Sequence, residues 1–179
     1  MVILAMMLLG TLSLDVNDAL INSGSTSLEM EAGLDALSYG QSLLDEILDK
    51  EYDQATTTGV RIFNYNLLTA PALLGPEVGE TFTLPDTATS NGFRSIRKYN
   101  DVDDYNGYSR NVRNQRLDIF TLTSRVKYVS EDHPDSVLNT QTFYKRVSVT
   151  ISNPYMVKDA NGNVFPLVMR DLAIYRRYF

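Results

Sequence analysis

The chain of 179 residues contains no cysteine and a single histidine, His133. Without cysteine the chain has neither a disulfide framework nor a thiolate metal site, and cysteine usage says nothing of the redox compartment. His133 stands in a polar connection, where we interpret it as a loop residue, because a general base needs an oriented partner and a pocket. No phosphate-binding glycine loop, G-x-S-x-G or H-E-x-x-H motif occurs. We therefore expect no enzyme.

Charge is absent from residues 1–14 (MVILAMMLLGTLSL), which precede an acidic amphipathic segment, 28–52. The apolar stretch is marginal as a membrane span, because Asp15 and Asp18 interrupt it before 20 residues are reached. It also lacks the positive start and small-residue cleavage site of a secretory signal. Acidic residues in this stretch fit better in a bundle of helices from many copies, where they can find partners, than in a membrane. We predict that assembly uses Met1, Ile3, Leu4, Met7, Leu8, Leu12, Asp15 and Asp18.

The charges are divided unevenly along the chain. Residues 1–53 contain ten acidic residues against Lys50 alone, whereas the remainder contains fifteen basic against twelve acidic residues. The two parts should attract, within one molecule or between neighbours. No basic stripe is interleaved with stacking aromatic residues, so we predict no nucleic-acid partner. The small group Arg94, Arg97 and Lys98 is interpreted as a solvated loop face.

The helical pattern is predicted to break at residues 22–27 (NSGSTS), where small polar residues and Gly24 lower helix propensity. Thr26 and Glu29 fit a capping box, which places the start of a second helix near Leu28. An apolar stripe on this helix is expected to pack on the rest of the molecule. Its members are Met30, Leu34, Leu37, Leu44, Ile47 or Leu48, and Tyr52.

After residue 59 the pattern changes to the alternation of β-strands. We expect strands within 60–68, 117–130 and 143–152, a long irregular connection over 69–91, and a hairpin that turns at Asn161-Gly162 and returns over 164–175. The buried faces are predicted to carry Phe120, Leu122, Val126 and Tyr128 in one strand and Val147, Val149 and Ile151 in the next. The expected sheet is antiparallel.

These patterns predict an α+β fold in two parts. Residues 1–55 form a long N-terminal hydrophobic-then-amphipathic stalk helix, broken near 22–27, and 1–21 is its assembly or membrane segment. Residues 56–179 form a β-rich head on which the helix packs.

A polar cluster, N-D-V-D-D-Y-N-G, covers residues 100–107. Three carboxylates, Asp101, Asp103 and Asp104, suit a hard cation such as Ca²⁺, although the spacing is not that of an EF-hand loop. The favoured interpretation is a turn, in which Asp and Asn side chains bond their own backbone and Gly107 reverses the chain. We therefore expect no cofactor, with Ca²⁺ at these aspartates as the alternative.

The order of segments, with D-V-D-D-Y-N-G (101–107) and R-V-S-V-T-I-S-N-P-Y (146–155), resembles the type IV pilin and pseudopilin superfamily, and minor pilins in particular. The chain departs from that pattern, because mature pilins begin with phenylalanine and have glutamate at the fifth position, where this chain has Met1 and Ala5. A different cleavage site, a divergent subunit, or an acidic role for Asp15 or Asp18 would each account for the departure.

The resemblance implies a structural subunit of an extracellular, cell-surface pilus filament. Its partners would be further copies of itself in a helical homopolymer, the pilus assembly machinery, and the inner membrane before assembly. The alternative is a membrane-anchored or tip-located minor pilin that acts as an adhesion module, whose 69–91 loop and aspartate cluster contact a ligand. Absence of a leader implies that the sequence is the mature form.

Overall fold

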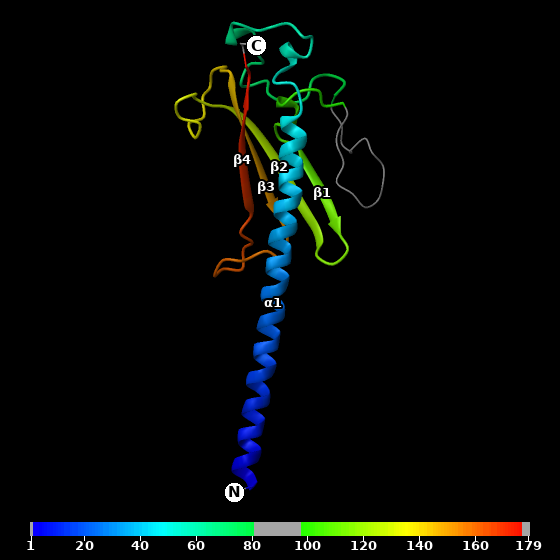
Figure 1. Ribbon diagram of the computed structural model, residues 1–179, viewed down its shortest axis with the longest axis vertical. Coiled ribbons are helices and arrows are strands. Elements are labelled where there is room, and N and C mark those ends of the chain that lie inside the picture. The colour runs from blue at the N-terminus through cyan, green and yellow to red at the C-terminus, as the bar shows by residue number, and fades with distance from the viewer. Residues whose placement is uncertain (1, 81–97, 177–179) are drawn as a thin grey trace.

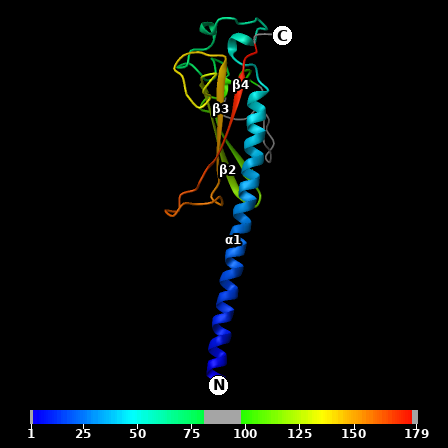
Figure 2. The same ribbon diagram turned by 60° about the vertical axis from the view of Figure 1, so that its left-hand side comes forward.

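A single helix crosses one face of a four-stranded sheet and continues beyond it (Figures 1 and 2). The computed structural model describes residues 2–80 and 98–176. Within the helix, α1 (Val2–Leu48), side chains are described at Leu14, Val16, Asn17, Leu20, Ile21 and from Ser23 onward. The predicted assembly residues Met1, Ile3, Leu4, Met7, Leu8, Leu12, Asp15 and Asp18 therefore lie outside the described residues or side chains.

The predicted fold class is wrong in its helical part. Residues 22–27 are helical without interruption, so no new helix starts near Leu28 and Thr26 and Glu29 form no cap. Glycine in a helix costs only about 1 kcal/mol relative to alanine, and a continuous helix tolerates that cost. Within the described residues, no helix is long and apolar enough to cross a membrane. The predicted hydrophobic-then-amphipathic stalk is therefore not supported.

The helix contacts the sheet through small residues. Ala32, Ala36 and Gly40 are buried, and they recur every fourth residue on one face of α1. A Cβ atom on Gly40 would lie 2.6 Å from Met169 Sδ and 2.7 Å from Ile151 Cδ1. The backbone of α1 therefore approaches Met169 and Ile151 so closely that an added methyl group would require these side chains to shift.

The predicted apolar stripe is wrong in its first half. Leu44, Ile47 and Tyr52 are buried as expected, but Met30, Leu34 and Leu37 are 65%, 67% and 48% exposed. The prediction favoured large side chains, whereas close packing of a helix on this sheet selected small ones.

The strands form one antiparallel sheet in the order β1-β2-β3-β4. Short 3₁₀ helices lie in the connections that precede β1. The bounds are η1 Gln54–Thr56, η2 Tyr65–Leu67, η3 Asp103–Tyr105, β1 Ser109–Asn114, β2 Asp118–Tyr128, β3 Tyr144–Ser152 and β4 Leu167–Ile174.

The predicted strands 117–130, 143–152 and 164–175 correspond to β2, β3 and β4. All of the side chains predicted to be buried in β2 and β3 are buried, because they point toward α1; Phe120, for example, packs edge-to-face on Tyr39. Gly162 has the positive φ expected of the turn between β3 and β4. The predicted strand 60–68 is wrong, since η2 occupies its end. Within the described part of the loop 69–91, residues 69–80 contain no strand.

Candidate functional site

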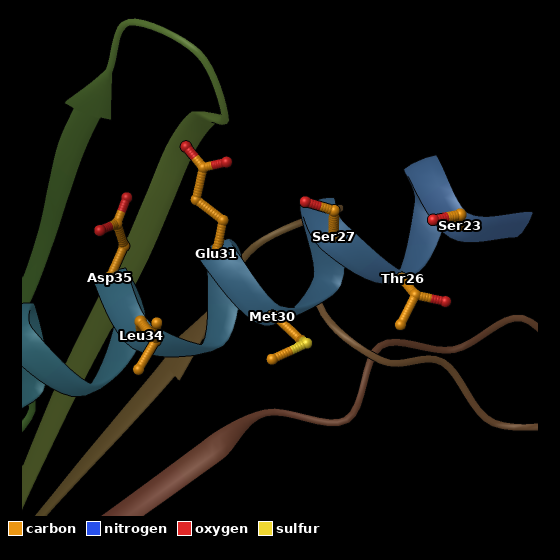
Figure 3. A pocket seen from close by; sticks show the side chains of 7 residues that line it. All are labelled: Ser23, Thr26, Ser27, Met30, Glu31, Leu34 and Asp35. Atoms are coloured by element: carbon orange, nitrogen blue, oxygen red, sulfur yellow. The ribbon is translucent and has the colours of Figure 1, made fainter. Parts of the chain in front are cut away.

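One face of α1 exposes an apolar strip. Met30, Leu34 and Leu37 are all at least 48% exposed, and their spacing of four and three residues places them side by side. Figure 3 shows Met30 and Leu34 on one side of the helix, with Glu31 and Asp35 directed toward the β1–β2 hairpin. The strip borders a shallow groove lined by Ser23, Thr26, Ser27, Met30, Glu31, Leu34 and Asp35.

Large apolar residues are also exposed nearer the N-terminus of α1. Leu14, Val16, Leu20 and Ile21 are at least half exposed, on the part of the helix that projects beyond the sheet (Figure 1). An exposed contiguous apolar surface of this kind is typical of a protein interface.

The sheet face that points away from α1 is basic. Strand alternation puts five basic residues on it, and we name them the basic outer face: Arg113, Arg125, Lys127, Arg146 and Arg170. Lys127 and Arg146 stand directly opposite each other, an arrangement of like charges that is unfavourable by itself. The exposed Asp135 carboxylate lies 3.6 Å from Arg146 and 3.7 Å from Arg170.

A second feature lies where the end of α1 meets the segment before β1. Glu51 pairs with Asp101 in an isolated parallel bridge, so the chain that leaves the helix positions the predicted aspartate cluster. The Glu51 N–H donates to the Asn100 carbonyl at 3.2 Å, and the Val102 N–H donates to the Glu51 carbonyl at 2.9 Å. These bonds fix residues 100–102 beneath the helix end.

The aspartates form the turn that the sequence predicted. Asp101 Oδ1 accepts hydrogen bonds from the N–H groups of Asp103 and Asp104, at 3.0 and 3.2 Å. Asp104 Oδ2 accepts from the N–H groups of Asn100 and Asp101, at 2.9 and 3.1 Å. Gly107 follows with a φ of +85°. Asp101, Asp103 and Asp104 are nevertheless almost completely buried, which a surface turn does not require.

Two glutamates from the preceding connection join these aspartates. One carboxylate oxygen from each of Glu77, Asp101 and Asp103 lies within 4.8 Å of the other two. The same is true of Glu77, Glu80 and Asp104. We call these five residues the carboxylate cluster. Glu77 and Glu80 are only half-buried, so the cluster reaches toward the surface on their side.

Lys145 of β3 forms an ion pair with Asp103 of this cluster. Its Nζ donates to the Tyr52 carbonyl at 2.7 Å and to Asp53 Oδ2 and Asp103 Oδ1 at 2.8 Å each. The side chains of Lys145 and of both aspartates are fully buried. The sequence interpretation missed this lysine. The alternation of β3 contained the signal, because Lys145 precedes Val147 and Val149 on the buried face.

The carboxylates of the cluster resist ionisation. Burial, together with the nearby Asp103 and Asp104 carboxyls, raises the pKa of Asp101 to about 9, although Lys145 opposes the rise. Burial raises the pKa of Glu77 to about 8, with help from the adjacent Glu80. Burial also raises the pKa of Asp104 to about 6, although hydrogen bonds from the backbone of Asp101 and Asn100 oppose the change. Ionisation of all five carboxyls would therefore place more negative charge here than Lys145 offsets.

A separate buried ion pair joins α1 to β1. Arg110 donates two hydrogen bonds to the Glu46 carboxylate, both at 3.1 Å, and Tyr105 donates to Glu46 Oε1 at 2.8 Å. Arg110 also donates to the Tyr108 hydroxyl at 2.6 Å. Because both charges of the pair have hydrogen-bonding partners, this network serves the packing of helix on sheet.

The remaining sequence candidates lie at the surface or outside the described residues. His133 is exposed, and its carbonyl accepts from the Ser136 N–H in a turn. Arg94 and Arg97 lie outside the described residues, and Lys98 is exposed.

Comparison of the chain with models of protein families, with curated proteins and with solved structures gave no match. The functional argument therefore rests on the apolar strip, the basic outer face and the carboxylate cluster.

Proposed function

We propose that the chain is a structural subunit of an extracellular pilin-like filament, in which α1 of one copy packs against neighbouring copies. The observation that carries this proposal is the apolar strip of α1. Met30, Leu34 and Leu37 face away from the sheet although they are large enough to fill a core. Burying such side chains stabilises a contact by about 25 cal/mol for each Å² of apolar surface removed from water.

Charge complementarity favours a second copy of the chain as the occupant of this face. Glu29 and Asp45 are exposed on α1 and Asp49 is exposed directly after it, whereas the basic outer face lies on the opposite side of the sheet. One copy therefore offers both an acidic helix and a basic surface to its neighbours. Such pairing steers the orientation of the contact more than it raises affinity.

The two surfaces are different and point in different directions. A contact between unlike surfaces of identical subunits does not close on itself unless the rotation happens to form a ring. Repetition of the contact therefore favours an open helical polymer, as in a filament.

The alternative role as a tip-located adhesion module has less support. In that role the aspartates at 101, 103 and 104 would contact a large ligand, but their side chains are buried. The exposed strip on α1 is accounted for by subunit packing without a ligand.

The proposal is tested by introducing charge into the apolar strip. In the double variant Met30→Lys, Leu34→Lys, we expect loss of large assemblies, because lysine at a buried contact must be desolvated without a partner. Sedimentation velocity and negative-stain electron microscopy of the full chain measure the assemblies directly. Circular dichroism shows whether the variant keeps its fold.

A matched control carries the same change elsewhere. Val60 and Phe63 are 60% and 64% exposed in the connection between η1 and η2, on neither α1 nor the sheet. The control variant Val60→Lys, Phe63→Lys should assemble like the unmodified chain. Equal assembly by both double variants, or a monomeric unmodified chain, would contradict the proposal.

A further inference from the structure

Several buried carboxylate oxygens of the cluster have no donor. Within the described part of the chain, no hydrogen bond reaches Asp101 Oδ2, Asp103 Oδ2, Asp104 Oδ1 or Glu77 Oε2. Asp101 and Asp103 are 0% exposed, so solvent does not replace the missing donors. Buried polar groups in folded proteins are otherwise hydrogen-bonded, and each exception requires a physical explanation.

The carboxylates that carry these oxygens lie close together. Glu77, Asp101 and Asp103 each contribute a carboxylate oxygen to a group in which all three atoms lie within 4.8 Å. The hydrogen bonds of the turn use Asp101 Oδ1, and Lys145 uses Asp103 Oδ1. The turn and the ion pair therefore hold the two aspartates in place, and the Oδ2 atom of each has no donor.

Lys145 offsets one negative charge, and it is shared with Asp53, which stands outside the cluster. A divalent cation among the free oxygens would supply the missing positive charge and satisfy several lone pairs at once. Bringing like charges together without such a partner is unfavourable in a buried environment.

The donor atoms select the class of metal. All of them are carboxylate oxygens, and the chain has no cysteine and no histidine near the cluster. Oxygen-only sites suit hard cations, whereas thiolate and imidazole suit softer transition metals. Ca²⁺ accepts six to eight oxygens in irregular geometry, while Mg²⁺ requires a near-ideal octahedron and keeps several waters. Several carboxylates held by a turn favour Ca²⁺.

We propose that Glu77, Asp101 and Asp103 bind a Ca²⁺ ion, with Asp104 and Glu80 at its margin. The site joins the connection before residue 81 to the segment before β1, directly beneath the end of α1. Occupancy would tie these segments to the sheet through Asp103 and Lys145.

The proposal is tested on the full chain after removal of divalent ions with EDTA and exchange into chelator-free buffer. Isothermal titration with CaCl₂ should give one bound ion per chain, and MgCl₂ should bind at least tenfold more weakly. Thermal unfolding followed by circular dichroism should shift upward by roughly 5 to 10 °C when Ca²⁺ is about 100-fold above its dissociation constant.

Two variants locate the site. Asp101→Asn retains an oxygen that can accept the two backbone hydrogen bonds of the turn, but it removes the charge. Glu77→Gln changes a half-buried residue at the edge and keeps the test usable if Asp101→Asn does not fold. Each variant should weaken Ca²⁺ binding at least tenfold and lose most of the thermal shift.

Asp159→Asn is the matched control, because Asp159 accepts backbone hydrogen bonds from Asn161 and Asn163 in an exposed turn between β3 and β4, outside the carboxylate cluster. This control should bind Ca²⁺ like the unmodified chain. A folded, unmodified chain with neither binding heat nor thermal shift would overturn the proposal, as would equal weakening by Asp159→Asn. These measurements do not depend on filament formation, so they separate failure of the metal site from failure of the proposed function.

Discussion

At the scale of single residues, Lys145 explains how the head contains so many buried acids. It donates three hydrogen bonds, and its Nζ also lies 4.5 Å from the centre of the Tyr52 ring. A buried ion pair is weak support for stability as a whole, but loss of one partner leaves an uncompensated buried charge. Lys145 is therefore a residue whose removal the fold should tolerate poorly.

We expect Lys145→Met to lower the free energy of unfolding by about 3 to 5 kcal/mol, because Asp53 and Asp103 lose their shared cation. Urea unfolding followed by circular dichroism measures the change. Lys127→Met, on the basic outer face of β2, should change stability by only about 0.5 kcal/mol. Similar losses in the two variants would show that Lys145 does not act through its buried acids.

The residue scale also shows what the sequence could predict of the candidate site. The turn formed by Asp101 and Asp104 was predictable, because Asp and Asn bond their own backbone in such clusters. The convergence of Glu77 was not predictable, since it depends on how a connection more than 20 residues earlier folds back. The alternation of β3 indicates that Lys145 lies on the buried face. It was not predicted there because lysine is rarely buried.

At the scale of elements, the docking of α1 on the sheet depends on Gly40. Its backbone approaches Met169 and Ile151 so closely that a Cβ atom would overlap both side chains. Gly33 lies on the same helix with open space around its Cβ position. Substituting Gly33 by alanine therefore measures only the intrinsic cost of glycine in a helix. Substituting Gly40 also measures the cost of crowding the sheet.

We expect Gly40→Ala to destabilise the chain by about 1 to 3 kcal/mol, because the added methyl group forces the sheet side chains from their positions. Gly33→Ala should instead stabilise it by roughly 0.5 to 1 kcal/mol through improved helix propensity. Thermal and urea unfolding measure both changes. A stabilising Gly40→Ala would mean that α1 does not pack as closely as described.

The elements were predictable where apolar alternation was strong. β2 and β3 carry apolar residues at alternate positions, interrupted by Ser124 in β2 and Lys145 in β3, and this pattern located both strands and their buried faces. β1 was missed because its sequence, SRNVRN, has one apolar residue, and its buried Arg110 is stabilised by Glu46 of the helix. The helix face was mispredicted because spacing alone does not distinguish Ala32 and Ala36 from Met30 and Leu34 as the packing residues.

At the scale of the whole molecule, the chain presents unlike surfaces on opposite sides. The apolar strip and exposed acids lie on α1, and the basic outer face lies across the sheet. Within one copy some of this charge is already paired, as in the 3.0 Å contact between Arg116 and Glu31. The remainder is available to orient neighbouring copies in the proposed filament.

The most direct measurement of this account is cryo-electron microscopy of material assembled from the full chain. The account predicts helical filaments in which Met30, Leu34 and Leu37 are buried against another copy. Filaments in which these three side chains face solvent, or a chain that stays monomeric at high concentration, would contradict it.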